Sequence, residues 1–158
     1  PSWYYEVVAP GFKYNLTDIA AALGLHQLKR LPAFQARREQ IAQAYFDAWA
    51  DLPLTLPPRA PAGDTHAWHL FVLRLTDGAP LDRDSFIEQM FALGIGCSVH
   101  YVPLHQHPYW RERYALRPGQ FPHSQAAYER MVSLPMYSRM TEADVQRVAA
   151  AAREALVG

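Results

Sequence analysis

Residues 11–31, GFKYNLTDIAAALGLHQLKRL, join a polar turn led by glycine to a helix that is apolar on nearly every side. Residues 19–25 offer no polar side chain, and a helix of that composition is normally buried all round. A chain of 158 residues buries such a helix with difficulty, because much of a small domain is surface. The pattern therefore fits two interpretations equally well: a central core helix, or a helix pressed against another domain or subunit. In the second case the turn would deliver Lys13, Tyr14 and Asn15 into a site there.

The rest of the chain predicts an α/β domain in which a small, mostly antiparallel sheet is covered by helices. Apolar runs and apolar–polar alternation predict strands over residues 67–75, 95–101 and 133–137. Pro32 is expected to separate the first two helices, and residues 102–122 are expected to form an aromatic loop broken by prolines. Three of the expected helices cover residues 16–31, 33–51 and 124–132. A further helix is expected to start at residues 81–84 and to end at Gly94. The last helix is expected to follow the capping pair Thr141 and Asp144.

The composition excludes several classes of protein. Lysine and arginine total 15, as do aspartate and glutamate, so no basic surface for nucleic acid is indicated. No apolar run reaches about 18 residues, so we expect no membrane insertion. The single cysteine, Cys97, excludes an intramolecular disulfide and fits a reducing cytoplasm. Because the chain starts with Pro-Ser-Trp-Tyr-Tyr and carries no signal peptide, we expect a cytoplasmic fragment, processed chain or domain.

The seven histidines are many for this length, but their spacing does not favour a metal site. Zinc needs three or four converging ligands. The predicted strand would separate His66 and His69 across its two faces, which is poor geometry for chelation, so no metal is expected. Cys97 falls on the apolar side of the strand expected over residues 95–101, and we expect it to be a core residue rather than a nucleophile.

Two basic side chains are the best candidates for binding. His100 is expected on the polar face at the end of a strand, where an imidazole can donate to an anion or a sugar hydroxyl. A satisfied surface histidine explains that position equally well. Lys13 and Lys29 are the only lysines. Lys13 lies in a turn just before a helix N-terminus, which favours contact with a phosphate; the alternative is an exposed turn lysine.

Several stretches together resemble one known family, the PLP-dependent nucleotide-sugar aminotransferases of the DegT/StrS type. The resemblance covers essentially the whole chain, in the family's order and spacing. The Lys-Tyr-Asn-Leu-Thr-Asp form of the first stretch is most similar to the branch known as UDP-4-amino-4-deoxy-L-arabinose–oxoglutarate aminotransferase, which modifies lipid A. The matching stretches are residues 11–31, Arg37-Arg38 with IAQAY (41–45), HAWHLFVLRL (66–75), LGIGCSVHYVPLHQHPYW (93–110) and ERMVSLPMYSRMTEADV (129–145).

The resemblance implies that residues 1–158 are the C-terminal small domain of a fold type I aminotransferase, with the large PLP-binding domain outside this chain. The lysine that bonds to PLP would lie in that large domain, so this chain would hold no catalytic residue and would be inactive alone. Family members are homodimers in which the corresponding turn reaches the PLP phosphate of the neighbouring subunit. Lys13 and Asn15 stand at the positions of its usual donors, and either side chain can donate there.

The same resemblance places His100, Tyr101 and His105 in the wall near the sugar nucleotide. It implies that the complete enzyme moves an amino group from glutamate, giving 2-oxoglutarate, to a keto-sugar nucleotide of the UDP-4-keto-pentose type. That reaction would serve the modification of lipid A or another surface polysaccharide. The alternative is a non-catalytic module of the same fold that stands alone and binds a sugar nucleotide or a protein.

Overall fold

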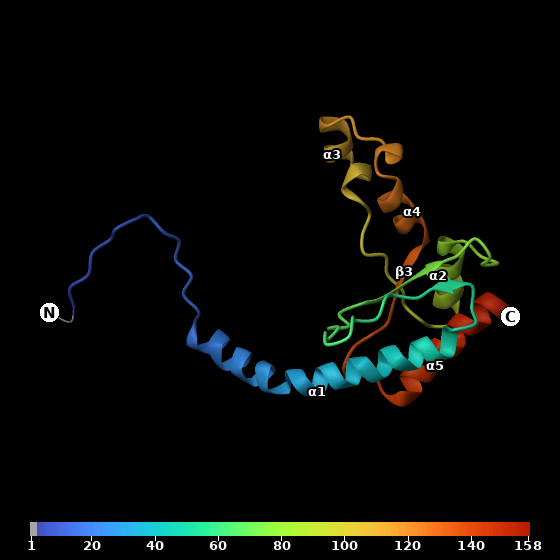
Figure 1. Ribbon diagram of the computed structural model, residues 1–158, viewed down its shortest axis with the longest axis horizontal. Coiled ribbons are helices and arrows are strands. Elements are labelled where there is room, and N and C mark those ends of the chain that lie inside the picture. Colours follow the sequence, from blue (N-terminus) through green and yellow to red (C-terminus); the bar gives the residue numbers. More distant parts are fainter. Residues whose placement is uncertain (1–2) are drawn as a thin grey trace. The chain divides into compact units, whose positions relative to one another are not determined.

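The computed structural model describes residues 3–158 and divides into two compact units, one ending at Ala33 and the other starting at Phe34. Figure 1 shows the ribbon with the element labels used below. The elements are α1 (Asp18–Trp49), β1 (Leu54–Thr55), β2 (Phe71–Leu75), α2 (Arg83–Ala92), the 3-10 helix η1 (Leu104–Gln106), α3 (Pro108–Arg113), the 3-10 helix η2 (Pro118–Gln120), α4 (Pro122–Arg130), β3 (Met131–Leu134) and α5 (Glu142–Val157).

The second unit is built on a sheet of three antiparallel strands in the order β1-β2-β3. The central strand β2 pairs Leu75 with Leu54 of β1, and Phe71 with Leu134 of β3. The predicted α/β fold with a small antiparallel sheet and covering helices is confirmed. Two of the strands expected from the sequence, over residues 67–75 and 133–137, correspond to β2 and β3 with shifted bounds.

One face of β2 forms the centre of the core. Phe71, Leu73 and Leu75 are buried there, as period-two alternation requires. The end of α1 packs on them through Tyr45 and Trp49, whose rings are stacked with centroids 4.4 Å apart. Both polar atoms of these aromatic side chains are satisfied. The Tyr45 hydroxyl donates to the Pro135 carbonyl at 2.8 Å, and Trp49 Nε1 donates to the Ala149 carbonyl of α5 at 3.1 Å.

The helix starts expected from capping residues are confirmed for α2 and α5. Asp82 caps α2, where its carboxylate accepts from the Ser85 N–H at 2.8 Å. After α2, Gly94 adopts a φ of +77°, a left-handed conformation that suits glycine. Thr141 and Asp144 form a reciprocal capping box at the start of α5, with each side chain accepting from the other residue's N–H.

The predicted break at Pro32 is wrong, because α1 runs continuously through that residue. Proline removes one backbone hydrogen bond from a helix, but its fixed φ is compatible with helical geometry. The residues on both sides are mostly alanine, leucine, glutamine and arginine, which favour helix. Their preference outweighs the single lost bond, so the helices expected over residues 16–31 and 33–51 are one element.

The strand expected over residues 95–101 is also wrong, because only Ser98 forms a bridge, to Ser133. The alternation of apolar and polar residues over 95–101 comes from packing on the core rather than from a strand. Ile95 is buried, and Cys97 is partly buried against the core. The strand expected from residue 67 starts only at Phe71. The residues before it include Trp68, whose φ of 45° ends the extended conformation.

The region expected to be a loop, residues 102–122, contains η1, α3 and η2. The prolines that suggested breaks are the first residues of helices: Pro108 starts α3, Pro118 starts η2 and Pro122 starts α4. Proline is favoured at that first position, because its missing N–H would have no partner there in any case. In this region proline therefore marks the starts of helices rather than their ends.

The first unit exposes the apolar helix that the sequence singled out. Ile19 is 78% exposed and Leu23 is 63% exposed, and Leu28 and Leu31 are exposed as well. The interpretation as a central core helix is therefore wrong for this chain. The interpretation as a helix that needs a further covering surface agrees with the exposure.

We expect the 158-residue chain to associate with itself, or to bind a hydrophobic dye, through this face of α1. Analytical ultracentrifugation across a range of concentrations, with dye fluorescence in parallel, measures both. An Ile19→Lys, Leu23→Lys double variant should reduce association and dye binding. Phe91→Lys is the matched control, since Phe91 is equally exposed but lies in the second unit. A monodisperse parent monomer without dye binding would contradict the expectation.

Candidate functional site

The side chains of His100 and Ser133 form a polar pair beside β3. The chain that follows α2 runs along β3, and Ser98 and Ser133 exchange two backbone hydrogen bonds of 3.1 and 2.7 Å. Two residues later, His100 Nδ1 lies 2.8 Å from Ser133 Oγ. Ser133 is buried and His100 is half-buried. The backbone bridge therefore holds the imidazole against a fixed point of the sheet.

A cavity of about 410 Å³ opens beside this pair. Tyr101 also lines it, with its ring edge-on to that of His100 at 4.8 Å between centroids, and 74% exposed. The polar side chains on this wall are therefore an imidazole, two phenol groups and the Ser124 hydroxyl, all of which can donate to the oxygen atoms of a ligand. The lining residues are His100, Tyr101, Val102, Pro103, Leu104, Ser124, Ala127, Tyr128 and Met131.

His105 differs from His100 because it is only 4% exposed and has internal partners. Its Nε2 lies 2.9 Å from Gln125 Oε1, an oxygen that also accepts from Gln106 at 2.7 Å. Gln125 in turn donates to Glu129 at 2.6 Å, and the His105 ring stacks on Phe121 with centroids 4.8 Å apart. These contacts tie η1 to α4, so His105 contributes to the structure of the cavity wall.

A second cavity, of about 460 Å³, lies beside His105. It shares Pro103, Leu104 and Ser124 with the first cavity, so the two adjoin. Its wall is mostly apolar and aromatic, with contributions from Trp110 and Phe121. The sequence-based expectation that His105 contacts the same ligand as His100 and Tyr101 stays a prediction.

Lys13 and Asn15 lie in the first unit, in the exposed, non-helical segment that precedes α1. Thr17 caps α1, since its Oγ1 accepts from the Ala20 N–H at 3.3 Å. Asn15 is thus not required as the cap of α1. His100, Tyr101 and His105 belong to the second unit.

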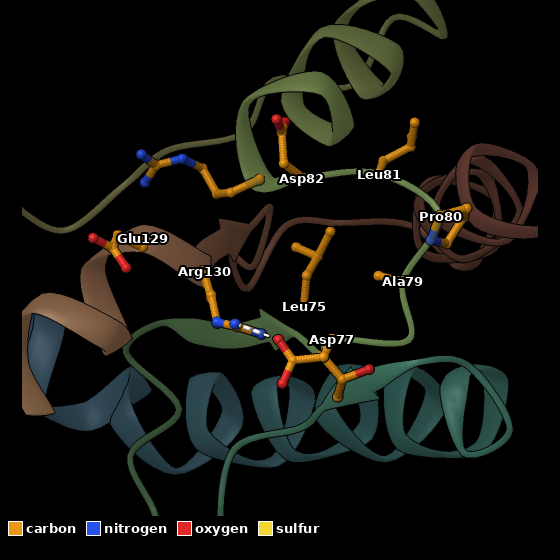
Figure 2. Close-up of a pocket in the computed structure, with 10 residues that line it drawn as sticks. Leu75, Asp77, Ala79, Pro80, Leu81, Asp82, Glu129 and Arg130 are labelled. Carbon is orange, nitrogen blue, oxygen red and sulfur yellow. Dashed lines mark hydrogen bonds and ion pairs between the residues drawn. The ribbon is translucent and has the colours of Figure 1, made fainter.

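Figure 2 shows a third cavity, of about 360 Å³, where the end of β2 faces the start of α2. Its charged side chains have structural partners: Arg130 points toward Asp77 and forms an ion pair with it. Arg83 donates to the Tyr128 carbonyl at 2.9 Å and lies over that ring, while Asp82 caps α2. With charges of both signs already paired, the cavity shows no preference for a charged ligand.

Cys97 and the histidines give no sign of thiol or metal chemistry. Burial raises the pKa of the Cys97 thiol to about 11, which keeps it protonated and poorly nucleophilic near neutral pH. Among residues 3–158 no three histidine, cysteine, aspartate or glutamate side chains gather as a metal site would require. Across the same residues no helix has the length and apolar character needed to span a bilayer.

Ser133 and Gln125, the partners of the two histidines, were not expected from the sequence. Ser133 carried a usable signal, since it is the polar residue of the apolar run MVSL, and a hydroxyl in a buried strand needs a partner. Gln125 lies in the polar sequence of α4 and carried no such signal.

Comparison with known proteins identifies the family. The family model for DegT/DnrJ/EryC1/StrS aminotransferases matches residues 2–153. An uncharacterized protein of Methanocaldococcus jannaschii is 43% identical over 91% of this chain and 38% of its own length. The spore coat polysaccharide biosynthesis protein SpsC of Bacillus subtilis is 42% identical over 99% of this chain and 41% of its own. The chain belongs to the DegT/DnrJ/EryC1/StrS aminotransferase family.

Solved structures agree with this assignment. Spr1654 of Streptococcus pneumoniae, provisionally named a sugar aminotransferase, matches in its PMP form with a TM-score of 0.84 and 27% identity. That match covers 98% of this chain and 39% of the other. The chain thus spans about two-fifths of the length of the relatives and structures that it matches. The particular similarity to the UDP-4-amino-4-deoxy-L-arabinose branch is not among these findings.

Proposed function

We propose that this chain is the C-terminal part of a PLP-dependent enzyme that transfers an amino group from glutamate to a keto-sugar nucleotide. The family match over residues 2–153 carries the proposal. The names of two relatives, one in polysaccharide biosynthesis and one a sugar aminotransferase, support the sugar as substrate. Because the chain spans about two-fifths of these relatives, the activity is proposed for the whole protein that contains it.

The proposed substrate is a UDP-4-keto-pentose, aminated for lipid A or another surface polysaccharide, with 2-oxoglutarate as the second product. Its support is the sequence of residues 13–18, Lys-Tyr-Asn-Leu-Thr-Asp, which resembles that branch of the family. We further propose a cytoplasmic homodimer. The exposed apolar side chains of α1 support a contact with another polypeptide surface.

The donors before α1 fit one part of the cofactor. The Lys13 ammonium and the Asn15 amide are both exposed, in a segment that leads into a helix N-terminus, and all three are favourable contacts for a phosphate. When bound, PLP supplies the electron sink for amino transfer. Lys13 and Lys29 are exposed, and neither lines the cavities described above. By its resemblance to the family, the lysine that bonds to PLP is proposed to lie in the large domain, outside this chain.

In this proposal His100 and Tyr101 hold the sugar nucleotide. In the whole enzyme we expect His100→Gln to raise the apparent KM for the sugar nucleotide about three- to tenfold, the loss of one hydrogen bond, with PLP binding unchanged. Steady-state amino transfer from glutamate measures the first quantity, and PLP absorbance the second. His123→Gln is the matched control, since His123 is exposed on α4 away from the cavity lining. A KM equal to the parent's would remove His100 from the substrate site, and absence of amino transfer by the parent would refute the function.

The 158-residue chain alone is expected neither to bond covalently to PLP nor to transaminate. Incubation with PLP, reduction with borohydride and peptide mapping would test this, since a covalently held cofactor becomes fixed to its lysine. Stoichiometric labelling of Lys13 or Lys29 alone would contradict the expectation. Weak labelling at both is the behaviour of exposed amines in general.

A further inference from the structure

The Ser133 hydroxyl has one partner in this structure. Ser133 lies in β3 between Val132 and Leu134, which both belong to the core. Its side chain therefore points to the opposite face of the sheet. There its Oγ lies 2.8 Å from His100 Nδ1, and it makes no other hydrogen bond to the described residues. Ser133 is only 5% exposed, so the hydroxyl depends on His100 rather than on water for its hydrogen bond.

The direction of this hydrogen bond follows from the number of donors. A hydroxyl has one O–H, and a buried O–H without an acceptor costs about 1–3 kcal/mol. If Nδ1 carried the imidazole proton, it would donate to Oγ and leave the hydroxyl proton without an acceptor. If Nδ1 is unprotonated, it accepts from the hydroxyl and both groups are satisfied. The second arrangement is therefore favoured, and it places the imidazole proton on Nε2.

We infer that Ser133 is a positioning residue that holds neutral His100 in its Nε2–H form, so that the imidazole presents a donor at the cavity beside Tyr101. His100 Nε2 has no hydrogen-bond partner among the described residues, and His100 lines that cavity. An Nε2–H group binds an acceptor oxygen of a ligand, such as a hydroxyl, carbonyl or phosphate oxygen. In this form His100 cannot take a proton at Nε2, so it binds and orients rather than acting as a base. The identity of that ligand as a sugar nucleotide rests on the proposed function.

The backbone of Ser133 is fixed independently of its hydroxyl. Its N–H and C=O are both engaged with Ser98, and it pairs with Val72 of β2 on the other side. A Ser133→Ala variant therefore keeps the ladder and removes only the donor to Nδ1. Ser98→Ala is the matched control: Ser98 belongs to the same bridge, is exposed, and its side chain has no partner in the described part of the chain.

The test is nitrogen NMR of the 158-residue chain with labelled histidine, at about pH 9, where imidazole is neutral. The His100 signals are assigned by their loss in His100→Gln. We expect the parent and Ser98→Ala to show an unprotonated Nδ1 and a protonated Nε2. Ser133→Ala should show a mixture of both forms, and Ser133→Thr, which restores the hydroxyl, should return the parent pattern. A protonated Nδ1 in the parent, or a parent pattern in Ser133→Ala, would overturn the inference.

A second measurement separates this inference from the proposed function. In the whole enzyme, Ser133→Ala should raise the apparent KM for the sugar nucleotide about three- to tenfold, as His100→Gln does, with little change in kcat. Ser133→Thr should restore it. A changed tautomer with an unchanged KM would support the positioning role and overturn the proposed contact between His100 and the substrate.

Discussion

Replacing Phe71 with alanine is expected to lower the free energy of unfolding by about 3–5 kcal/mol, the range for a fully buried phenylalanine. Phe71 starts the central strand, is 0% exposed, and has aromatic side chains around it. Its ring lies 5.2 Å from that of Tyr45, 5.8 Å from that of Trp49 and 5.9 Å from that of Trp68, measured between centroids. Removing it leaves a cavity among large rigid rings that cannot easily close. Urea denaturation followed by circular dichroism measures the change.

The matched control for Phe71 is Phe91→Ala on α2. Phe91 is 78% exposed, so its removal is expected to change the free energy of unfolding by no more than about 0.5 kcal/mol. Both variants lose the same phenyl ring, which is fully buried at Phe71 and exposed at Phe91. Equal effects at the two positions would mean that the core is not centred on β2.

Local sequence patterns were sufficient to predict the structure where a side chain bonds to the backbone of its own helical turn. The caps at Asp82 and Thr141 bond three residues along the chain, so the pattern of residue types defines the geometry. The apolar run of β2 was equally readable, and its residues Phe71, Leu73 and Leu75 pack on the core side. The fold class follows from features of this kind, spread along the whole chain, whereas the family was expected from the resemblance of several longer stretches.

The sequence was less informative where one residue type has two structural uses. Proline ends helices in many sequences, yet Pro32 lies inside α1 and Pro108 begins α3. Whether a proline lies inside a helix or begins one depends on the residues that flank it, and composition alone did not separate these two cases. The expected loop and the expected helix break both fail for this reason.

The two histidines of the motif His100 to His105 show why the site was only partly predictable. Their partners lie far along the chain: Ser133 is 33 residues from His100, and Gln125 is 20 residues from His105. Burial and direction come from those distant residues. The sequence could therefore nominate both histidines for binding, while the fold shows that His105 is buried among internal partners and that His100 lines the cavity beside Tyr101.

Replacing both Lys13 and Asn15 with alanine in the whole protein is expected to weaken PLP retention about ten- to a hundredfold. A charged hydrogen bond to phosphate contributes about 1.5–3 kcal/mol, and that difference in free energy converts to this range. The two side chains are exposed beside the N-terminus of α1, where the helix dipole favours an anion. Dialysis followed by PLP absorbance gives the dissociation constant of each variant.

The single variants decide which side chain makes the contact, a question that the sequence left open. If the ammonium is the donor, Lys13→Ala reproduces the double variant and Asn15→Ala resembles the parent; if the amide is the donor, the pattern reverses. Lys29→Ala is the control, because Lys29 is the other exposed lysine and lies on α1 away from its N-terminus. A Lys13-based contact should also weaken as salt rises, since exposed charge pairs are screened over about 10 Å at 0.1 M. If both single variants and the double variant hold PLP as the parent does, the turn before α1 does not bind the phosphate.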